Sequence, residues 1–174
     1  TTASLSDRRS AYRYSVPIHS LVTNSATTTR LIDIGNLRFE VAECGTGQRL
    51  ALCLHGFPES AFSWRHQLPF LASLGYRVWA PNLRGYGQSS RPVAVSAYHI
   101  DRLVEDIDGL IIATETDRVL LVGHDWGGII SWQFVMDETY APKVQRLIFY
   151  TLPIVLECYL LKHLLSRELL DLCL

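Results

Sequence analysis

An aspartate at position 125 stands in a segment that could hold a reactive side chain clear of its surroundings. The segment Gly123-His124-Asp125-Trp126-Gly127-Gly128 follows the apolar run 119–122 and leads into a helical pattern. This is the frame of a nucleophile elbow, in which glycines permit a tight strand-to-helix turn. A carboxylate needs no base before it attacks, and it suits displacement at an sp³ carbon. An aspartate after a strand can also be a helix N-cap, but the flanking Gly123, Gly127 and Gly128 favour a nucleophile that forms an alkyl-enzyme ester.

A second segment could bind the negative charge that such a reaction develops. The residues His55-Gly56-Phe57-Pro58-Glu59-Ser60 follow a buried-strand pattern at 50–54. In an elbow architecture one oxyanion donor is the backbone N–H after the nucleophile, here of Trp126, and the other comes from the loop after the third strand. We expect the second donor to be the N–H of Phe57, with glycine and proline shaping the loop around it.

Four segments in this order resemble the α/β-hydrolase superfamily and, within it, the epoxide hydrolases. The segments are His55-Gly56-Phe57-Pro58-Glu59-Ser60, Ser63-Trp64-Arg65-His66-Gln67, Leu83-Arg84-Gly85-Tyr86-Gly87-Gln88-Ser89 and Gly123-His124-Asp125-Trp126-Gly127-Gly128. The resemblance covers roughly residues 31–150 and implies an enzyme that converts a small-molecule epoxide to a vicinal diol with no cofactor and no metal. It also implies a substrate pocket lined by Trp126, Phe57 and Pro58 beside Asp125, and a structural role for His55.

The same resemblance implies groups that this sequence does not supply in recognisable form. In the family, two tyrosines of a cap domain protonate the epoxide oxygen, and a later acid and histidine activate water to hydrolyse the ester. Only residues 126–174 follow Asp125, and Glu157 with His163, or Tyr150 with Tyr159, are poor substitutes. We therefore expect a fragment or a truncated isoform that carries the nucleophile half and lacks repeated turnover. After Tyr150 the chain departs from the family pattern, and Asn82 stands where the family often has an acid.

Two alternative functions stay open. Haloalkane dehalogenases use the same aspartate and neighbouring tryptophan, but they typically have asparagine where Phe57 stands, because a side-chain amide helps to bind halide. A phenylalanine side chain has no N–H to donate, which favours the epoxide branch. The second alternative is a truncated, non-catalytic homologue that acts through binding.

The elements that must position these segments alternate between strands and helices. Strand patterns occur at 30–34, 37–41, 50–54, 77–80, 119–122 and 144–150, and helical patterns at 61–74, 98–114 and 127–136. Gly35-Asn36 is expected to form a two-residue hairpin turn. The alternation predicts an α/β fold, with a mostly parallel sheet and helices on both faces, as an incomplete α/β-hydrolase fold whose strand 144–150 lies at an edge.

Other ionisable residues are interpreted as structural or solvated. The acids of the second helical pattern are expected to form a solvated face rather than a metal site; they are Asp101, Glu105, Asp106 and Asp108. Three histidines without an evident partner are expected to be structural or solvated; they are His66, His99 and His124. The four cysteines have no metal-ligand spacing, and Cys53 is expected to act as a small buried hydrophobe.

Composition divides the chain into three parts: a Ser/Thr-rich, flexible extension at 1–28, the hydrolase-like core at 29–150, and a leucine-rich tail or start of a cap at 151–174. The extension favours a disordered leader on a cytoplasmic protein, although its composition also resembles an organellar transit peptide. With 16 Lys and Arg against 17 Asp and Glu, nothing favours binding to nucleic acid. No segment reaches the ~18–20 apolar residues of a transmembrane helix, and nothing indicates an oligomeric state.

Overall fold

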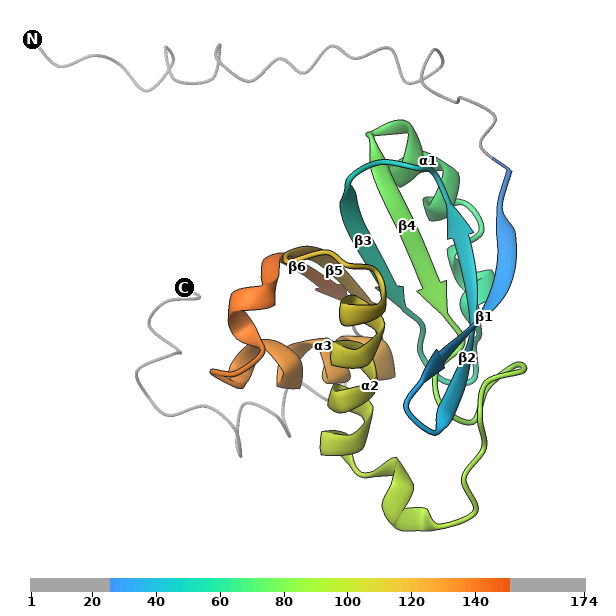
Figure 1. Cartoon of the computed structure of the whole chain (residues 1–174), viewed down its shortest axis with the longest axis vertical. Coiled ribbons are helices and arrows are strands. Elements are labelled where there is room, and N and C mark those ends of the chain that lie inside the picture. Colours follow the sequence, from blue (N-terminus) through green and yellow to red (C-terminus); the bar gives the residue numbers. More distant parts are fainter. Residues whose placement is uncertain (1–25, 151–174) are drawn as a thin grey trace, which may run out of the picture.

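In the computed structural model, the structure is described for residues 26–150 (Figure 1). The expectations for the rest of the extension and for the leucine-rich tail lie outside these residues. The strands are β1 (Thr28–Ile34), β2 (Leu37–Cys44), β3 (Arg49–Leu54), β4 (Tyr76–Pro81), β5 (Val119–His124) and β6 (Val144–Tyr150). The α-helices are α1 (Gln67–Ser73), α2 (Ile100–Ala113) and α3 (Trp126–Met136), and short 3₁₀ helices span Ala61–Trp64, Val95–Tyr98 and Ala141–Lys143.

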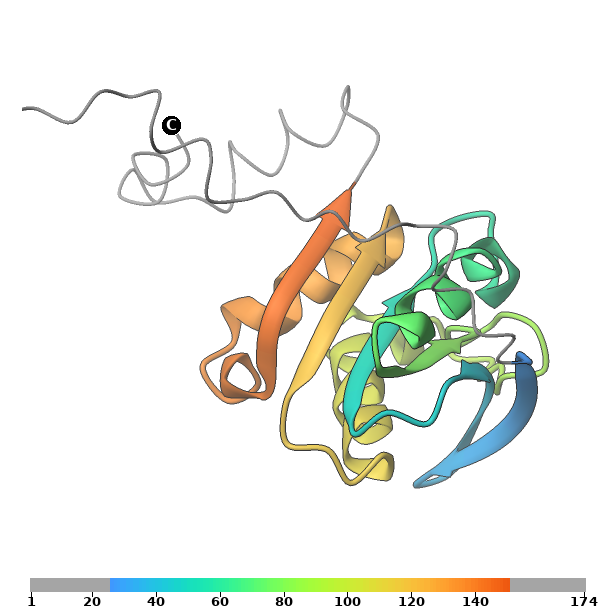
Figure 2. The ribbon, with the colours of Figure 1, turned by 90° about the horizontal axis from the view of Figure 1, so that it is seen from above.

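The strands form one mixed sheet in the order β1-β2-β4-β3-β5-β6. Strands β3, β4, β5 and β6 are parallel to their neighbours within that group, whereas β2 pairs antiparallel with both β1 and β4. The predicted hairpin turn joins β1 to β2, with Gly35 at a φ of +56°. Figure 2 shows β6 and β1 at the two ends of the described sheet, so the prediction that residues 144–150 lie at an edge is confirmed for this part of the chain.

Helices cover both faces of the sheet, as the sequence predicts. Alternate residues of β3 point to opposite sides: Leu50, Leu52 and Leu54 join the core beneath α2 and α3, whereas Ala51 and Cys53 join a second core with α1. The helices α2 and α3 contact each other on the first side (Figure 1). Cys53 is fully buried, as predicted, and burial raises the pKa of its thiol to about 12. Its thiol is therefore unreactive near neutral pH.

The prediction of one continuous helix at 61–74 is wrong, because the chain forms two short helices there. A 3₁₀ helix over Ala61–Trp64 ends before α1 begins at Gln67. Pro69 explains the break: proline has no N–H, and its ring clashes with the carbonyl four residues earlier inside a helix. In the observed arrangement Pro69 lies in the first turn of α1, where its missing N–H has no helical partner to lose.

The acids of α2 do not all form a solvated face, so that prediction is wrong for Asp106. Asp106 is 5% exposed and accepts hydrogen bonds from Arg84 Nε and Nη2, at 2.8 and 2.5 Å. Arg84 also donates to the backbone carbonyls of Ala97 and Arg102. This buried ion pair therefore fixes the start of α2 and the turn before it to the loop that follows β4.

Candidate active site

Asp125 occupies a single-residue turn between β5 and α3. Its backbone φ of +51° and ψ of −116° lie outside the usual regions for a residue with a side chain. Such a conformation costs about 1–3 kcal/mol and persists where the surrounding structure enforces it. Asp125 stands at the N-cap position of α3, yet its side chain makes no capping hydrogen bond to the helix. The N-cap alternative therefore lacks the hydrogen bond that would define it.

The glycines of the elbow let α3 pack directly on the strands. A Cβ at Gly123 would lie 2.6 Å from the carbonyl oxygen of Gly127, and a Cβ at Gly127 would lie 2.2 Å from the carbonyl oxygen of Leu54. Both contacts are with backbone atoms, which cannot rotate away as a side chain can. These positions thus require glycine because of close backbone approach, and the approach fixes the turn that presents Asp125.

Replacing Gly127 by alanine is expected to lower the free energy of unfolding by about 3 kcal/mol, because α3 must move away from β3 to admit the methyl group. The matched control is Gly109→Ala in α2, where the added Cβ would meet the side-chain methyl Cγ2 of Ile34 at 2.3 Å. Ile34 is only half-buried at the end of the edge strand β1, so its side chain can shift, and alanine favours the helix. The expected loss is therefore at most about 1 kcal/mol. Urea unfolding of both variants measures the difference, and equal losses would contradict the packing explanation.

The loop that follows β3 reaches the carboxylate of Asp125. The backbone N–H of Phe57 donates to Asp125 Oδ1 at 2.8 Å. Gly56 allows this contact, because a Cβ there would lie 2.5 Å from the Asp125 Cβ. As the first residue of α3, Trp126 contributes an N–H without an acceptor inside the helix. Of the two backbone groups predicted as oxyanion donors, the Phe57 N–H contacts the Asp125 carboxylate and the Trp126 N–H follows Asp125 directly in the chain.

The same two loops are linked by a histidine–carboxylate hydrogen bond that the sequence did not reveal. His124 Nδ1 lies 3.0 Å from Glu59 Oε2, and both side chains are partly buried. The contact gives His124 a partner that the sequence pattern did not show, and it agrees with the structural role expected for this residue. Only the positions of the two residues hinted at this contact, because His124 precedes Asp125 and Glu59 lies in the segment 55–60 that was expected to approach it. The pair joins the elbow to the loop that carries Phe57.

His55 connects the Phe57 loop to the loop that follows β4. Its imidazole is fully buried, and the N–H of Leu83 donates to Nε2 at 3.0 Å. Nδ1 therefore carries the proton and donates to the carbonyl of Gly56 at 2.9 Å. With both ring nitrogens engaged, neither is left to accept a proton from a substrate. The Tyr86 and His55 rings pack in a T-shaped arrangement with centroids 4.7 Å apart. Burial, and then the charge of Asp125, raise the pKa of the Tyr86 phenol.

Burial lowers the pKa of His55 below its ordinary value of 6.5. The unfolded chain then binds this proton more readily than the folded chain, so stability falls as the pH drops below 6.5 and through the pKa of the folded state. Above 6.5 the contribution is complete. Urea unfolding between pH 4 and 8 should show a slope that is smaller in His55→Gln, which has no titrating ring. An unchanged slope in the variant would assign the acid sensitivity to other groups.

Asn82 anchors the loop after β4 through a carboxylate. Its Nδ2 donates to Glu40 Oε2 at 2.6 Å, and the same oxygen accepts the N–H of Gln88 at 2.8 Å. Its Oδ1 accepts the N–H of Ala61 at 2.8 Å. The amide can donate to Glu40 whereas an ionised acid at this position could not. Asparagine at position 82, where the family often has an acid, is therefore compatible with the neighbouring carboxylate of Glu40.

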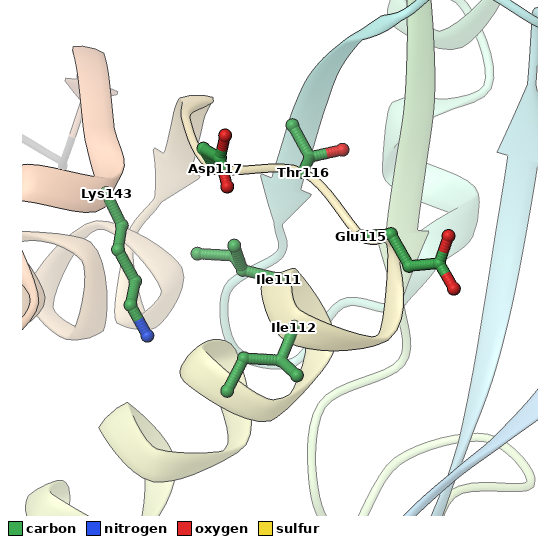
Figure 3. A pocket seen from close by; sticks show the side chains of 6 residues that line it. All are labelled: Ile111, Ile112, Glu115, Thr116, Asp117 and Lys143. Carbon is green, nitrogen blue, oxygen red and sulfur yellow. The ribbon is translucent and has the colours of Figure 1, made fainter.

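The side chains predicted to line the substrate pocket lie on the two segments that meet at Asp125, and they are open to solvent in the described structure. Phe57 is 64% exposed and Trp126 49% exposed, and Pro58 is also exposed. A cavity of about 330 Å³ lies elsewhere, lined by Ile111, Ile112, Glu115, Thr116, Asp117 and Lys143 (Figure 3). The loop that lines this cavity comes directly before β5, whereas Asp125 comes directly after β5. The cavity therefore lies at the amino ends of the parallel strands, and Asp125 lies at their carboxyl ends. Asp125 and Phe57 lie at the carboxyl ends of the parallel strands, which is where ligands bind in such sheets.

Among residues 26–150 no group of three or more histidine, cysteine or acidic side chains is arranged to hold a metal ion. In the same part of the chain, no helix has the length and apolar character needed to span a bilayer.

Comparison with known proteins defines the class to which this fold and site belong. The alpha/beta hydrolase fold family matches residues 52–167, and the chain belongs to that family. Within it, the chain is similar to epoxide hydrolases. Epoxide hydrolase A of Mycobacterium tuberculosis is 50% identical over 108 residues, which are 62% of this chain and 34% of the relative. Epoxide hydrolase 3 of Siraitia grosvenorii is 45% identical over 105 residues, 60% of this chain and 33% of the relative.

Solved structures give the same similarity. A crystal structure of an epoxide hydrolase from Vigna radiata superimposes with a TM-score of 0.69 at 40% sequence identity, covering 74% of this chain and 39% of that chain. Epoxide hydrolase A from Mycobacterium thermoresistibile has a TM-score of 0.70 at 35% identity, covering 79% of this chain and 45% of that chain. The chain thus spans about a third of the length of the curated relatives it matches, and the described residues form the part of the fold that contains the elbow.

Proposed function

We propose that this chain carries the nucleophile half of an epoxide hydrolase, with Asp125 as the nucleophile. The observation that carries this proposal is the 2.8 Å hydrogen bond from the Phe57 N–H to Asp125 Oδ1, in a side chain that does not cap its own helix. Oδ1 is held, so we infer that Oδ2 attacks a carbon of the epoxide ring. The new C–O bond forms as the ring C–O bond breaks, and the ring oxygen leaves with the electron pair and takes a proton from an acid.

The second half of the reaction would use the backbone donors. Water adds to the ester carbonyl carbon, and the carbonyl oxygen gains negative charge that the N–H groups of Phe57 and Trp126 stabilise. Collapse of this intermediate releases the diol and restores Asp125. The water must lose a proton to a base: both ring nitrogens of His55 are engaged, and Nδ1 of His124 faces Glu59. The later acid and histidine that the resemblance to epoxide hydrolases implies are not recognisable in this sequence. We therefore expect the 174-residue chain to form the ester faster than it hydrolyses it.

The proposal extends to the substrate and the surroundings of the enzyme. Phe57, Pro58 and Trp126 present apolar surface next to the carboxylate, which suits a hydrophobic small-molecule epoxide. The division at residues 28 and 150 into extension, core and tail, and a cytoplasmic location, stay predictions from composition.

Incubation of the 174-residue chain with styrene oxide tests the proposal. Intact-mass spectrometry is expected to show one added epoxide, and peptide mapping should assign it to Asp125. No adduct together with no diol would overturn the proposal. Steady diol formation would support the hydrolase and contradict the expected accumulation of ester. A simple haloalkane serves as the comparison, because faster labelling by the haloalkane would favour the dehalogenase alternative.

A further inference from the structure

We propose that His55 is a positioning residue that directs and polarises the backbone N–H of Phe57 toward Asp125. The inference rests on the proposed function, because it assigns that N–H a role in charge stabilisation. It goes beyond a packing role for His55, since it connects the buried imidazole to the reacting carboxylate through one peptide bond.

The connecting unit is the peptide bond between Gly56 and Phe57. Its carbonyl oxygen and its N–H belong to one planar group and point in opposite directions. His55 Nδ1 donates to the carbonyl oxygen at 2.9 Å, while the N–H donates to Asp125 Oδ1 at 2.8 Å. A plane held at both ends cannot rotate without breaking one of these hydrogen bonds. The carbonyl also accepts the N–H of Glu59 at 3.0 Å, which closes the turn.

The hydrogen bond that Nε2 of His55 accepts determines that the proton of the neutral ring is on Nδ1. Leu83 presents its N–H to Nε2 at 3.0 Å, and a neutral imidazole that accepts at one nitrogen must donate at the other. The next residue in the chain, Arg84, is held by the buried Asp106 of α2. A series of hydrogen bonds thus leads from the Leu83 N–H through His55 to the Gly56–Phe57 peptide, and the Arg84–Asp106 pair anchors the start of that series to α2 through the chain.

Hydrogen bonds in series strengthen one another, because each polarises the group that makes the next. Donation by His55 to the Gly56 carbonyl makes the Phe57 N–H a stronger donor. Loss of a complete oxyanion donor lowers catalytic rates by about 10²–10³-fold. Loss of only the group that orients the donor is expected to have a smaller effect, of about tenfold.

Two variants of His55 separate the roles of its ring nitrogens. In His55→Asn the side-chain amide nitrogen takes the place of Nδ1 and can donate to Gly56, but it cannot reach Leu83. In His55→Gln the terminal oxygen takes the place of Nε2 and can accept from Leu83, but the donor to Gly56 is lost. Both variants remove the ring from the same buried site, so the packing loss is matched.

The first measurement is the amide proton shift of Phe57 in the NMR spectrum of the 174-residue chain, which needs no catalysis. We expect an upfield shift in His55→Gln and a value near that of wild type in His55→Asn. The wild-type imidazole should be the Nδ1-protonated tautomer by ¹⁵N NMR, a result that does not depend on whether the variants fold. The Nε2-protonated tautomer, or equal Phe57 shifts in the two variants, would overturn the inference.

The second measurement tests whether the change at the Phe57 amide alters the rate at which the ester at Asp125 is cleaved. Chain labelled with styrene oxide at Asp125 is treated with hydroxylamine, which adds to the ester carbonyl carbon and forms an oxyanion. Collapse of the oxyanion breaks the ester C–O bond, releases the diol and leaves a hydroxamate at position 125. Release is expected to be about tenfold slower in His55→Gln than in wild type, with most of the rate retained in His55→Asn. Equal release rates would overturn the role in charge stabilisation. If wild type is not labelled at all, the proposed function fails, while the Phe57 shift still decides whether His55 positions the peptide.

Discussion

Asp125→Asn is expected to reduce covalent labelling by styrene oxide at least about 10³-fold, because the amide has no anionic oxygen to attack the ring carbon. The amide oxygen can still accept the hydrogen bond from Phe57, which Asp125 Oδ1 accepts at 2.8 Å. The folded structure should therefore be retained, and the loss should report on chemistry. The rate of adduct formation by intact-mass spectrometry measures it, with circular dichroism as the check on folding.

The matched control for this variant is Asp117→Asn. Asp117 is an exposed carboxylate at the amino ends of the parallel strands, beside the cavity of Figure 3. Its removal changes the net charge by the same amount and should leave the labelling rate unchanged. Residual labelling in Asp125→Asn at the wild-type rate would show that the epoxide reacts with another side chain, and the assignment of Asp125 would be wrong.

Asp106→Asn is expected to lower the free energy of unfolding by about 3–5 kcal/mol, because it leaves the Arg84 guanidinium buried without its counter-charge. The two side chains are each only 7% exposed. Burial raises the pKa of Asp106, and the hydrogen bonds from Arg84 oppose that rise. The cost of desolvating both charges is thus already present in the fold, and the variant removes the attraction that offsets it. Urea unfolding followed by circular dichroism gives the measurement.

Glu105→Gln provides the control from the neighbouring position on α2. Glu105 pairs with Arg102 at the surface, where both side chains are about half exposed, and such pairs contribute roughly 0–1 kcal/mol. A double variant, Arg84→Met with Asp106→Leu, should recover part of the stability lost in Asp106→Asn, since it removes both buried charges. If Asp106→Asn is as stable as Glu105→Gln, the ion pair does not stabilise the fold.

The sequence allowed the elbow to be predicted because its requirements are local. Glycines at fixed spacing around Asp125, an apolar strand before it and a helical pattern after it describe one continuous stretch of chain. The observed strand β5 and helix α3 begin and end within two residues of those predicted. The alternation of strands and helices likewise predicted a sheet with both faces covered.

Pairings between distant residues could not be predicted in this way. Arg84 and Asp106 are 22 residues apart, Glu40 and Asn82 are 42 apart, and Glu59 and His124 are 65 apart. In the sequence, Asp106 is one acid among four on a helix, and only the loop after β4 makes it a buried counter-ion. Pro69, by contrast, is a local signal, and it divides the helical pattern at 61–74 into two short helices.

The amino-acid sequence by itself determined which residue stands at the tip of the elbow and which backbone groups follow it, because backbone strain and glycine requirements act over a few bonds. The tertiary structure alone decided that the Phe57 N–H faces Asp125 and that the Leu83 N–H faces the His55 ring. The physical reason is that a hydrogen bond depends on distance and direction between groups, and those are set only when strands far apart in the chain pack into one sheet.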